Sequence, residues 1–489
     1  MSNTTQPNQL NEAESRLAKV AAIRERDGIV WKDRFDRTHT IVAARQAGEG
    51  ATVKTAGRVT AARWMGKLMF GRIYDIDGDI QFSLSMADLG EEQFKFMKAN
   101  LDIGDFIGIE GTIYTTTQGE LTINGQNTVI LSKALRGLPE KWHGLTDIET
   151  RYRQRYLDII SNPEARETMK LRFRLLRFIR DFMHRHDFIE LETPILQNVA
   201  SGAAAAPFVT HHNALDADFF LRISPELFLK QAVAAGFDRV FEIAKDFRNE
   251  GMSPQHLQEF TMIEWYAAYW DFNDNIEFLI KFFQEMLMTL KGTLKIPYQG
   301  IELDFSNFAR LNYIDEINKL TGSDILEWKD LDAAKKIVAD KGLFGMGEIK
   351  DIKSVMSLVD QIWKKKIRAN LIQPTIVFNY PAYMIPLARR SDKDPRRIDI
   401  FQLVVSTAEL VKAYSELVDP VEQRRAFEEQ MDNKAAGEEE GFDLDEDFIK
   451  AMEHGMPPQS GLGLGIDRLM TMLADQPTVR DVILFPLMK

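Results

Sequence analysis

The chain has 489 residues, of which 45% are hydrophobic and 27% charged, and its formal net charge is −12. These proportions are typical of a globular enzyme of roughly two to four domains and exclude a collagen-like or disordered chain. Because the sequence has no cysteine, disulfides, thiolate metal sites and a cysteine nucleophile are excluded. The sequence has no apolar stretch long enough to span a membrane and no secretory hydrophobic region, so we expect a cytoplasmic protein without a membrane partner.

Residues 1–50 are expected to form a helix followed by an extended arm. In the run NEAESRLAKVAAIRERDGI, helical spacing places Leu17, Val20, Ala21 and Ile23 on one apolar face, with charged residues opposite.

Residues 51–135 carry the pattern of a small barrel. From Val53 to about Ser132, short alternating or apolar runs are separated by Gly and Asp turns, with one helical stretch near Glu91–Lys98. Five short strands and one intervening helix predict a closed barrel of the OB type. Residues 136–160, which include the basic run Arg151, Arg153 and Arg155, are expected to form a linker.

Residues 161–489 are predicted to form a larger α+β domain. The run ARETMKLRFRLLRFIRDFMHRHDF predicts an amphipathic helix, and RVFEIAKDFRNEG and EFTMIEWYAAY predict strands. Residues 274–372 are expected to be a largely helical insertion. The acidic stretch 438–447 is expected to be a solvated loop.

Polar side chains gather in the segment 247–266. Alternation places Phe260, Glu264 and Tyr266 on one face of a strand, and Arg248 and Glu250 on one face of the preceding strand. Such a cluster is costly to bury unless a polar ligand binds, and arginine suits a phosphate or a carboxylate. The alternative is a surface hairpin with ordinary ion pairs.

A second cluster lies near the C-terminus, after the weaker strand-like run FIELETPIL in chain order. In GLGLGIDRLMTML, Gly461, Gly463 and Gly465 alternate before Arg468, which is expected in the first turn of a helix. Glycines allow a ligand to approach the backbone, and an arginine at a strand–helix junction suits phosphate. The alternative is a tight structural turn, since the spacings of the dinucleotide fingerprint and the P-loop are absent.

Taken together and in this order, the three segments resemble the class II aminoacyl-tRNA synthetases. The runs between them narrow the resemblance to the bacterial-type lysyl-tRNA synthetases, notably RISPELFLKQAVAAGFDRVFEIAKDFRNEG, AYSELVDP, PPQSGLGLGIDRL and RDVILFP. The resemblance extends from about residue 10 to the end. It implies an OB-type anticodon-binding barrel, a class II catalytic domain on a mostly antiparallel sheet, and a homodimer.

The resemblance also implies an activity and a set of site residues. Such enzymes activate L-lysine with ATP to lysyl-adenylate and transfer it to the 3′ end of the lysine tRNA, with Mg²⁺ as cofactor. Arg248 and Arg468 would be catalytic, and ATP would be bound by Arg248, Glu250, His256, Phe260, Glu409 and Arg468. Lysine would be bound by Gly202, Glu226, Glu264, Tyr266, Lys412, Tyr414, Glu416 and Gly463, and the anticodon by Arg63, Phe70, Gln81 and Glu120. For Glu226 the alternative is a helix N-terminal role.

Several positions depart from the family pattern. The family has two glutamates as magnesium ligands; here the second is Glu409 and the first position is Gln402, which brings no negative charge. Lys412 replaces an asparagine and Tyr414 a phenylalanine; Ala206 replaces an arginine and Leu257 an asparagine. We hypothesise that Lys412 compensates for Gln402, so that the reaction needs less Mg²⁺. The alternative is that Lys412 points to solvent or pairs with Glu409 or Glu416.

Two other functions stay open. One is an enzyme of the same fold with a shifted substrate, such as another diamino acid or a protein acceptor. The other is a tRNA-binding relative with weakened or lost catalysis, which Gln402 favours and Arg248, Glu409 and Arg468 oppose.

Overall fold

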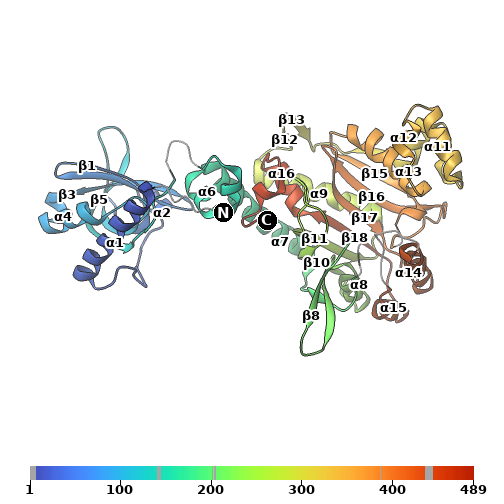
Figure 1. The fold of residues 1–489 in the computed structure, drawn as a ribbon, viewed down its shortest axis with the longest axis horizontal. Coiled ribbons are helices and arrows are strands. Elements are labelled where there is room, and N and C mark those ends of the chain that lie inside the picture. The colour runs from blue at the N-terminus through green and yellow to red at the C-terminus, as the bar shows by residue number, and fades with distance from the viewer. Residues whose placement is uncertain are drawn as a thin grey trace. The chain divides into compact units, whose positions relative to one another are not determined.

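A computed structural model describes residues 7–139, 145–200, 202, 205–385, 387–435 and 444–488. The chain divides into two compact units, residues 1–166 and 167–489 (Figure 1). Most of the predicted acidic loop, residues 438–443, lies outside the described residues.

The first unit contains a closed barrel of five strands in the order β1-β2-β3-β5-β4, which confirms the predicted OB-type architecture. Alternate residues such as Ile73, Ile80 and Phe82 fill its interior, as the sequence alternation requires. The strands are β1 Thr52–Met65, β2 Leu68–Asp75, β3 Gly78–Ser85, β4 Phe106–Thr115 and β5 Leu121–Ser132. The helices around them are α1 Pro7–Asp27, α2 Ile41–Ala47, α3 Met86–Leu89 and α4 Glu91–Asn100.

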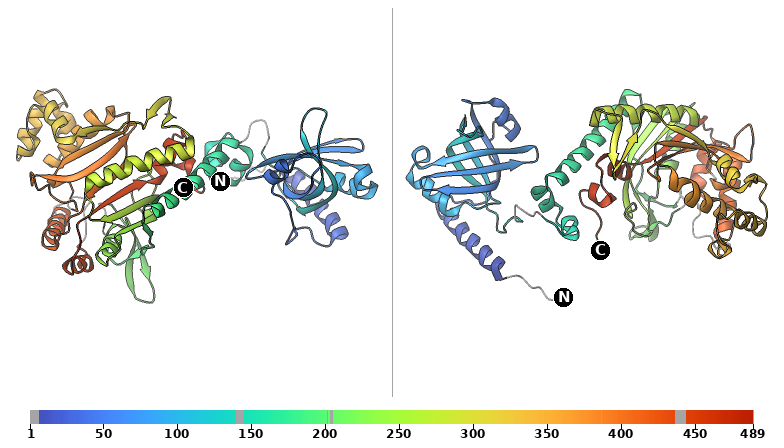
Figure 2. Two further views of the ribbon diagram at one scale, coloured as in Figure 1. Left: turned by 180° about the vertical axis from the view of Figure 1, so that it is seen from behind. Right: turned by 90° about the horizontal axis from the view of Figure 1, so that it is seen from above.

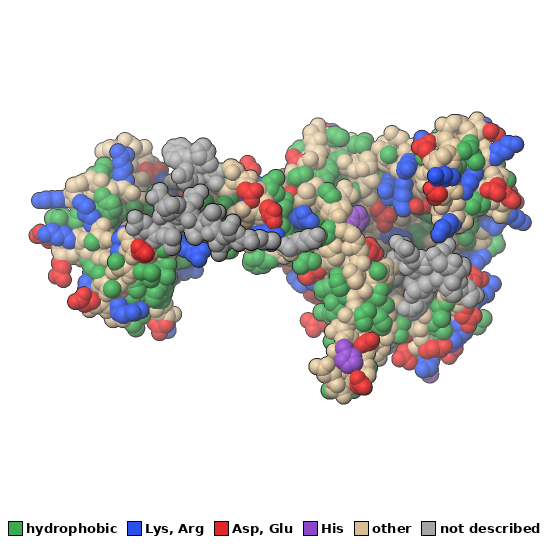
Figure 3. Space-filling model, in the orientation of Figure 1, with side chains coloured by type: hydrophobic (Ala, Val, Ile, Leu, Met, Phe, Trp, Pro, Cys, Tyr) green, Lys and Arg blue, Asp and Glu red, His purple; other side chains and the backbone are tan. Residues whose placement is uncertain are grey.

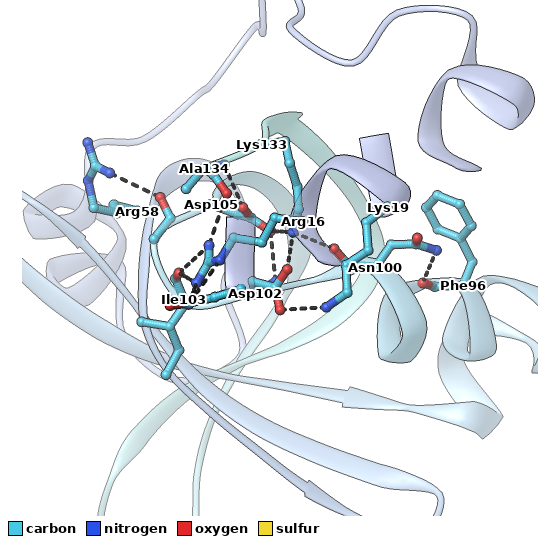
Figure 4. A network of polar contacts seen from close by, with 12 residues as sticks. Arg16, Lys19, Arg58, Phe96, Asn100, Asp102, Ile103, Asp105, Lys133 and Ala134 are labelled. Atoms are coloured by element: carbon cyan, nitrogen blue, oxygen red, sulfur yellow. Dashed lines mark hydrogen bonds and ion pairs between the residues drawn. The ribbon is translucent and has the colours of Figure 1, made fainter. Parts of the chain in front are cut away.

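Helix α1 is attached to the barrel through a narrower stripe than predicted. It buries Arg16, Val20 and Ile23, whereas Leu17 is 52% exposed and Ala21 is also exposed, so the expected apolar face is partly wrong. The reason is that Arg16, Val20 and Ile23, at positions i, i+4 and i+7, form the row of side chains that is buried against the barrel, where Arg16 makes hydrogen bonds. Its guanidinium donates to the carbonyl oxygens of Ile103 and Ala134, at 3.2 and 2.9 Å (Figure 4).

A buried lysine completes this polar network beneath α1. Lys133 Nζ donates to Asp105 Oδ2 at 2.8 Å and to the carbonyl oxygen of Asn100 at 2.7 Å, and it also pairs with Asp102 (Figure 4). Each buried charge therefore has a partner, as burial requires. The network joins α1, the end of α4 and the end of β5.

The residues predicted as a linker after the barrel are largely helical from Ile148 onward. They form α5 Ile148–Arg153 and α6 Arg155–Ser161, which precede α7 Pro163–Arg185. Arg155 is buried and pairs with Asp158 at 2.7 Å, and Arg151 reaches the same carboxylate at 2.8 Å. Part of this basic run therefore stabilises the helical turn itself.

The second unit is built on an eight-stranded sheet in the order β14-β15-β16-β17-β18-β11-β10-β6. Only the outer pairs β14–β15 and β10–β6 are parallel, so the predicted mostly antiparallel sheet is confirmed. Its strands are β6 Ile189–Glu190, β10 Arg239–Phe247, β11 Glu259–Ala268, β14 Ala309–Asn312, β15 Thr375–Pro381, β16 Arg397–Val405, β17 Ala408–Ser415 and β18 Gln459–Gly465.

One face of this sheet is covered by two long helices, α7 and α9 Phe272–Lys291 (Figure 2). Ile263 and Trp265 of β11 pack into the core beneath them, together with Phe182 and Phe282 from the helices. Because strand residues alternate between faces, Glu264 and Tyr266 lie on the opposite face. The core thus determines which residues of β11 can reach a ligand.

The predicted helical insertion over 274–372 is only partly correct. Its first segment is α9, whose residues Leu279 and Phe283 belong to the main core, and it is followed by the hairpin β12 Lys295–Tyr298 and β13 Ile301–Asp304 and by β14 of the sheet. The largely helical part follows β14 (Figure 1). It consists of α10 Tyr313–Thr321, α11 Leu331–Asp340, α12 Met346–Ile349, α13 Val355–Ile362, a π-turn Trp363–Ile367 and two short 3₁₀ segments, Ile325–Glu327 and Arg368–Asn370. A further 3₁₀ turn, Ala382–Met384, follows β15.

The remaining elements surround the open face of the sheet. They are the strands β7 Leu196–Gln197, β8 Phe208–His212 and β9 Ala217–Leu221, the helices α8 Glu226–Ala234, α14 Pro420–Ala435, α15 Glu446–Glu453 and α16 Ile466–Leu473, and a 3₁₀ turn Val479–Val482. At the tip of the β8–β9 hairpin, His211 pairs with Asp216 and Asp218, and Figure 3 shows a histidine beside acidic side chains there. Among the described residues, we find no helix with the length and apolarity needed to cross a membrane.

Candidate active site

A cavity of about 450 Å³ opens on the face of the sheet that faces away from α9. It is formed by β11, β17 and β18, the loop between β10 and β11, and the first turns of α8 and α16. The predicted residues that line it are Gly202, Glu226, Arg248, Glu250, His256, Phe260, Glu264, Tyr266, Glu409, Lys412, Tyr414, Gly463 and Arg468. Segments more than 200 residues apart in the sequence are therefore brought together.

Strand register explains why these residues meet. Glu264 is opposite Gly463, Gly463 is opposite Lys412, and Lys412 is opposite Gln402, so the four form one row across β11, β18, β17 and β16. The next row joins Tyr266, Gly461 and Tyr414 in the same way.

Arg248 and Phe260 form one end of the cavity. The Arg248 guanidinium lies 5.1 Å from the centre of the Phe260 ring, and its buried Nε has no hydrogen-bond partner among the described residues. Arg248 and Glu250 follow the end of β10 at Phe247, so the prediction that they share a strand face is wrong. The loop between β10 and β11 begins at Arg248. Its base is held by a hydrogen bond of 2.8 Å from the backbone N–H of Arg248 to the carbonyl oxygen of Gln258.

His256 and Arg468 are in direct contact at the same end. Arg468 Nη2 and His256 Nε2 are 2.6 Å apart, and Arg468 Nη1 donates to the carbonyl oxygen of Glu409 at 2.9 Å. Burial, with the added repulsion of Arg468, lowers the pKa of His256 below its usual value. A neutral His256 accepts the arginine N–H, which leaves the rest of the guanidinium for an anionic ligand.

Two buried carboxylates, Glu226 and Glu264, line the other end of the cavity, and a third lies behind them. Ser224 Oγ donates to Glu264 Oε1 at 2.9 Å and the Tyr266 hydroxyl to Glu264 Oε2 at 3.2 Å. The Tyr414 hydroxyl donates to Glu226 Oε1 at 2.7 Å, so this departure from the family pattern adds a hydrogen bond to the site. Burial raises the pKa of Glu264 well above its usual range, and Asp246 and Glu226 raise it further.

Glu416, the third carboxylate, lies behind the residues that line the cavity and is only 2% exposed. It pairs with Lys230, a residue that sequence reasoning missed, and Lys230 also donates to Glu226 at 2.6 Å. Burial raises the pKa of Glu416 to about 8 against the opposing effect of Lys230. The only signal in the sequence was the i, i+4 spacing of Glu226 and Lys230 on one helix face.

Two glycines are needed by the site for different reasons. Gly202 has a φ of +92° and lies against Ser224 and Glu226, so its backbone conformation suits only glycine. A Cβ at Gly461 would overlap the ring of Tyr266 and the carboxylate of Glu416. Gly461 therefore makes room for the protein's own side chains, rather than for a ligand as the sequence suggested.

The two residues proposed as magnesium ligands, Glu409 and Gln402, differ in their position relative to the cavity. Glu409 lines the cavity, whereas Gln402 does not line it and its Oε1 accepts a hydrogen bond from the Tyr380 hydroxyl at 2.7 Å. Among the described residues, no group of three or more metal-binding side chains is clustered. Lys412 lines the cavity without an ion pair to any described carboxylate, so the alternative pairings with Glu409 and Glu416 are not observed.

The other two departures concern the cavity rim. Leu257 lines the cavity and packs with Val479 and Ile483, so an apolar contact stands where the family has an amide. Ala206 contributes its carbonyl oxygen, which accepts the backbone N–H of Asn249 at 2.7 Å.

The four predicted anticodon residues lie on neighbouring barrel strands. Arg63 is opposite Phe70 on β1 and β2, and Gln81 on β3 donates to Thr122 Oγ1 at 2.9 Å. Glu120, just before β5, pairs with Arg72 at 2.7 Å. Sequence reasoning missed Arg72, although its spacing of two from Phe70 places both on one strand face.

Comparison with known proteins agrees with both units. A family model described as "tRNA synthetases class II (D, K and N)" matches residues 147–489, and one described as "OB-fold nucleic acid binding domain" matches residues 53–131. The chain therefore belongs to the class II tRNA synthetase family.

Relatives narrow the similarity within this family. The chain is 46% identical to a protein named lysine–tRNA ligase from Aquifex aeolicus, over 89% of this chain and 73% of that protein. It is 42% identical to the protein of that name from Carboxydothermus hydrogenoformans, over 98% of this chain and 99% of that protein. A third, from Pelotomaculum thermopropionicum, is 43% identical over 97% of this chain and 94% of that protein.

Proposed function

We propose that the protein is a lysine–tRNA ligase, which joins L-lysine to the 3′ end of the lysine tRNA with ATP as energy source. The observation that carries this proposal is the cavity, in which arginines occupy one end and buried carboxylates the other. Arginines can bind both the phosphates of a nucleotide and the carboxylate of an amino acid, and buried carboxylates can bind ammonium groups. Lysine and ATP together carry these groups.

The proposed binding arrangement follows the two ends of the cavity. Phe260 offers a flat surface for the adenine, while Glu250 and His256 bind the nucleotide and Arg468 the terminal phosphate. Gly202, Glu226 and Glu264 surround the α-amino group. Tyr266 and Glu416 bind the ε-ammonium, and Lys412, Tyr414 and Gly463 complete the wall beside the amino acid. A neutral side chain would leave Oε1 of Glu416 without a cation, which disfavours other amino acids.

The chemistry requires orientation and charge stabilisation rather than a covalent enzyme intermediate. An oxygen of the lysine carboxylate attacks the α-phosphorus of ATP, and pyrophosphate leaves with the electron pair of the broken P–O bond. Arg248 binds both the carboxylate and the α-phosphate, and stabilises the charge that builds up on the phosphoryl oxygens. A ribose hydroxyl of the tRNA then attacks the lysyl carbonyl carbon, and AMP leaves.

Magnesium is expected to be bound mainly through the nucleotide. Glu409 is the carboxylate available to it, since the amide oxygen of Gln402 already accepts a hydrogen bond from Tyr380. Mg²⁺ prefers several oxygen ligands, which the ATP phosphates and water provide. A bound ion would neutralise phosphate charge, alongside the fixed positive charge of Arg248 and Arg468 at that end. Lys412, in the wall beside the amino acid, would add positive charge next to the substrate carboxylate.

The barrel is proposed to read the anticodon through Arg63, Phe70, Gln81 and Glu120. Phe70 offers a stacking surface for a base, and the three polar side chains offer donors and acceptors to its edge. We further propose that the protein works as a homodimer in the cytoplasm. Closed twofold assemblies are the commonest among oligomeric enzymes, and the resemblance to class II synthetases supports this state.

One experiment separates this function from the remaining alternatives. Amino-acid-dependent ATP–pyrophosphate exchange is measured with lysine, ornithine, arginine and β-lysine, and transfer to lysine tRNA is measured in parallel. Exchange and transfer with lysine alone are expected. Exchange with another diamino acid would indicate a shifted substrate, and folded protein that binds tRNA without any exchange would indicate a relative that has lost catalysis.

A further inference from the structure

A lysine of the protein itself lies behind the proposed lysine-binding pocket. Lys230 is on α8, one turn after Glu226, and its side chain is fully buried. Its ammonium donates to Glu226 Oε1 at 2.6 Å, pairs with Glu416, and lies 5.6 Å from the centre of the Tyr414 ring. The pocket thus already contains one primary ammonium, which is held by the carboxylates expected to bind another.

The two carboxylate oxygens of Glu416 have different neighbours. Oε2 faces the ammonium of Lys230, whereas Oε1 is turned toward Gly461 and the ring of Tyr266. The carboxylate is buried, and the backbone N–H of Gly461 is within hydrogen-bonding reach of it, but the cation Lys230 faces only Oε2 among the described residues. A buried anionic oxygen beside no cation is incompletely stabilised, so Oε1 is suited to an incoming ammonium.

The charges of the pocket also fit two further cations. Glu226, Glu264 and Glu416 bring three negative charges when ionised, and Lys230 brings one positive charge. The difference, two negative charges, equals the charge of the two ammonium groups of lysine, while the lysine carboxylate is bound by Arg248. An amino acid with a neutral side chain brings one cation fewer.

We infer that Lys230 is a specificity-determining positioning residue: it holds one oxygen of Glu416 so that the other is presented to the side-chain ammonium of the substrate. The inference rests on the proposed function. Lys230 does not touch the reacting atoms. It acts through Glu416 and Glu226, whose positions determine how far into the pocket an ammonium can reach and how many positive charges the pocket accepts.

The test uses Lys230→Met, which keeps most of the side-chain volume and removes the charge. Without it, the carboxylates lose their fixed partner and retain a proton, so Glu416 attracts the substrate less strongly. We expect the KM for lysine in ATP–pyrophosphate exchange to rise roughly 100-fold, the cost typical of truncating a buried charge pair. The KM for ATP should stay within about twofold, and the preference for lysine over its neutral analogue norleucine should fall.

A matched control is available in the same unit. Lys335 is also buried, but within the described part of the chain its ammonium donates only to the backbone carbonyls of Lys350 and Ile352, and it does not line the cavity. Lys335→Met should lower the melting temperature without changing the KM for lysine. If Lys230→Met behaves like Lys335→Met, Lys230 is merely structural and the inference is overturned.

Two further measurements keep the inference testable if Lys230→Met does not fold. Lys230→Gln can donate hydrogen bonds to both carboxylates but carries no charge, so it should fold and still show the raised KM for lysine; an unchanged KM would contradict the inference. In Lys230→Ala, added ethylammonium should restore lysine-dependent exchange, whereas in the unsubstituted protein it should only compete with lysine. Absence of lysine-dependent exchange in the unsubstituted protein would instead refute the proposed function.

Discussion

Gln402 and Lys412 are opposite each other in the ladder between β16 and β17. Their side chains therefore share the face of the sheet that carries the cavity, where Lys412 lines the wall and Gln402 bonds to Tyr380. A neutral side chain and a cation thus lie next to each other on this face, beside the place where the amino acid is proposed to bind.

The first prediction concerns magnesium. If Lys412 compensates for Gln402, Lys412→Asn should lower kcat and shift the Mg²⁺ concentration for half-maximal exchange upward, because fixed positive charge near the phosphates is lost. A Mg²⁺ titration of ATP–pyrophosphate exchange measures both, and calorimetric titration of Mg²⁺ into the protein–ATP complex provides a second readout. Unchanged kcat and unchanged Mg²⁺ dependence would refute the compensation.

The second prediction concerns the pH dependence of lysine binding. The pKa of Glu416 is raised to about 8 and that of Glu264 is raised well above its usual range, in a pocket that also contains Glu226, Lys230, Tyr266 and Tyr414. Bound lysine favours the ionised carboxylates, so binding releases a proton below pH 8. Affinity should therefore rise from pH 6 to about pH 8, by up to about tenfold per pH unit for one proton, and then level off.

Calorimetry in buffers of different ionisation enthalpy gives the number of protons released on lysine binding. A value of at least one at pH 7 is expected, since Glu416 loses its proton and Glu264, whose pKa is also raised, can lose a second. Binding that is independent of pH between 6 and 8, without proton release, would show that these carboxylates are already ionised in the free protein.

The third prediction concerns stability. Asp246 is fully buried, its oxygens receive no hydrogen bond from the described residues, and burial raises its pKa to about 7 despite the attraction of Arg222 and Arg248. The native carboxyl keeps its proton up to about pH 7, whereas the unfolded one loses it near pH 4. Stability therefore falls as pH rises through this window. Asp246→Asn should stabilise the protein by about 2 kcal/mol at pH 8 and by much less at pH 5.

Melting temperatures at both pH values test this. Asp187→Asn is the control, since that carboxylate is 91% exposed and should change little at either pH. A stability gain of Asp246→Asn that is the same at pH 5 and pH 8 would exclude titration as its cause.

The fourth prediction concerns the barrel surface. Arg72 holds Glu120 at 2.7 Å and also pairs with Asp79. Arg72→Ala should release Glu120 and raise the KM for tRNA by up to about fivefold, since a partly exposed pair contributes at most about 1 kcal/mol. Lysine-dependent exchange without tRNA should not change. Lys95→Ala on α4 is the control, since Lys95 forms an exposed ion pair with Glu91; an equal effect of both substitutions would contradict a specific role of Arg72.

The fifth prediction concerns the attachment of α1. Arg16→Met removes the donors to the carbonyls of Ile103 and Ala134, which lie beneath the helix (Figure 4). The first unit should lose about 2 kcal/mol of stability, and amide hydrogens of α1 should exchange faster. The exposed Arg24→Met serves as the control. Unchanged exchange in α1 would show that Val20 and Ile23 hold the helix without Arg16.

The sequence was sufficient for the local patterns but not for the contacts between distant segments. Alternation correctly predicted that Glu264 and Tyr266 share a face, because one side of β11 packs in the core. The same reasoning failed for Arg248, because the strand ends one residue earlier, where the β10–β11 connection begins. A strand boundary depends on the partner strand, which a single segment does not reveal.

Two residues show what local reasoning lacks. A glutamate and a lysine at i and i+4 on a helix usually form a surface pair, so the spacing of Glu226 and Lys230 gave no sign of burial. Leu17 was expected on the apolar face of α1, but the barrel contacts a stripe that includes Arg16 instead. In both cases the surroundings, rather than the segment, determine which side chain is buried.

The row Glu264, Gly463, Lys412 and Gln402 has a geometric consequence for the reaction. Its members occupy four successive strands, so the row runs at right angles to them and spans about 14 Å, three strand spacings. The spacing of Glu264 and Lys412 across the sheet is therefore set by backbone hydrogen bonds between strands. The separation of the phosphate end from the ammonium end runs the other way, along β11 from Phe260 to Glu264, which is four residues or about 13 Å. Insertions between the strands can vary in length without changing either spacing, whereas a slip of one strand by two residues would move its side chains into the neighbouring row.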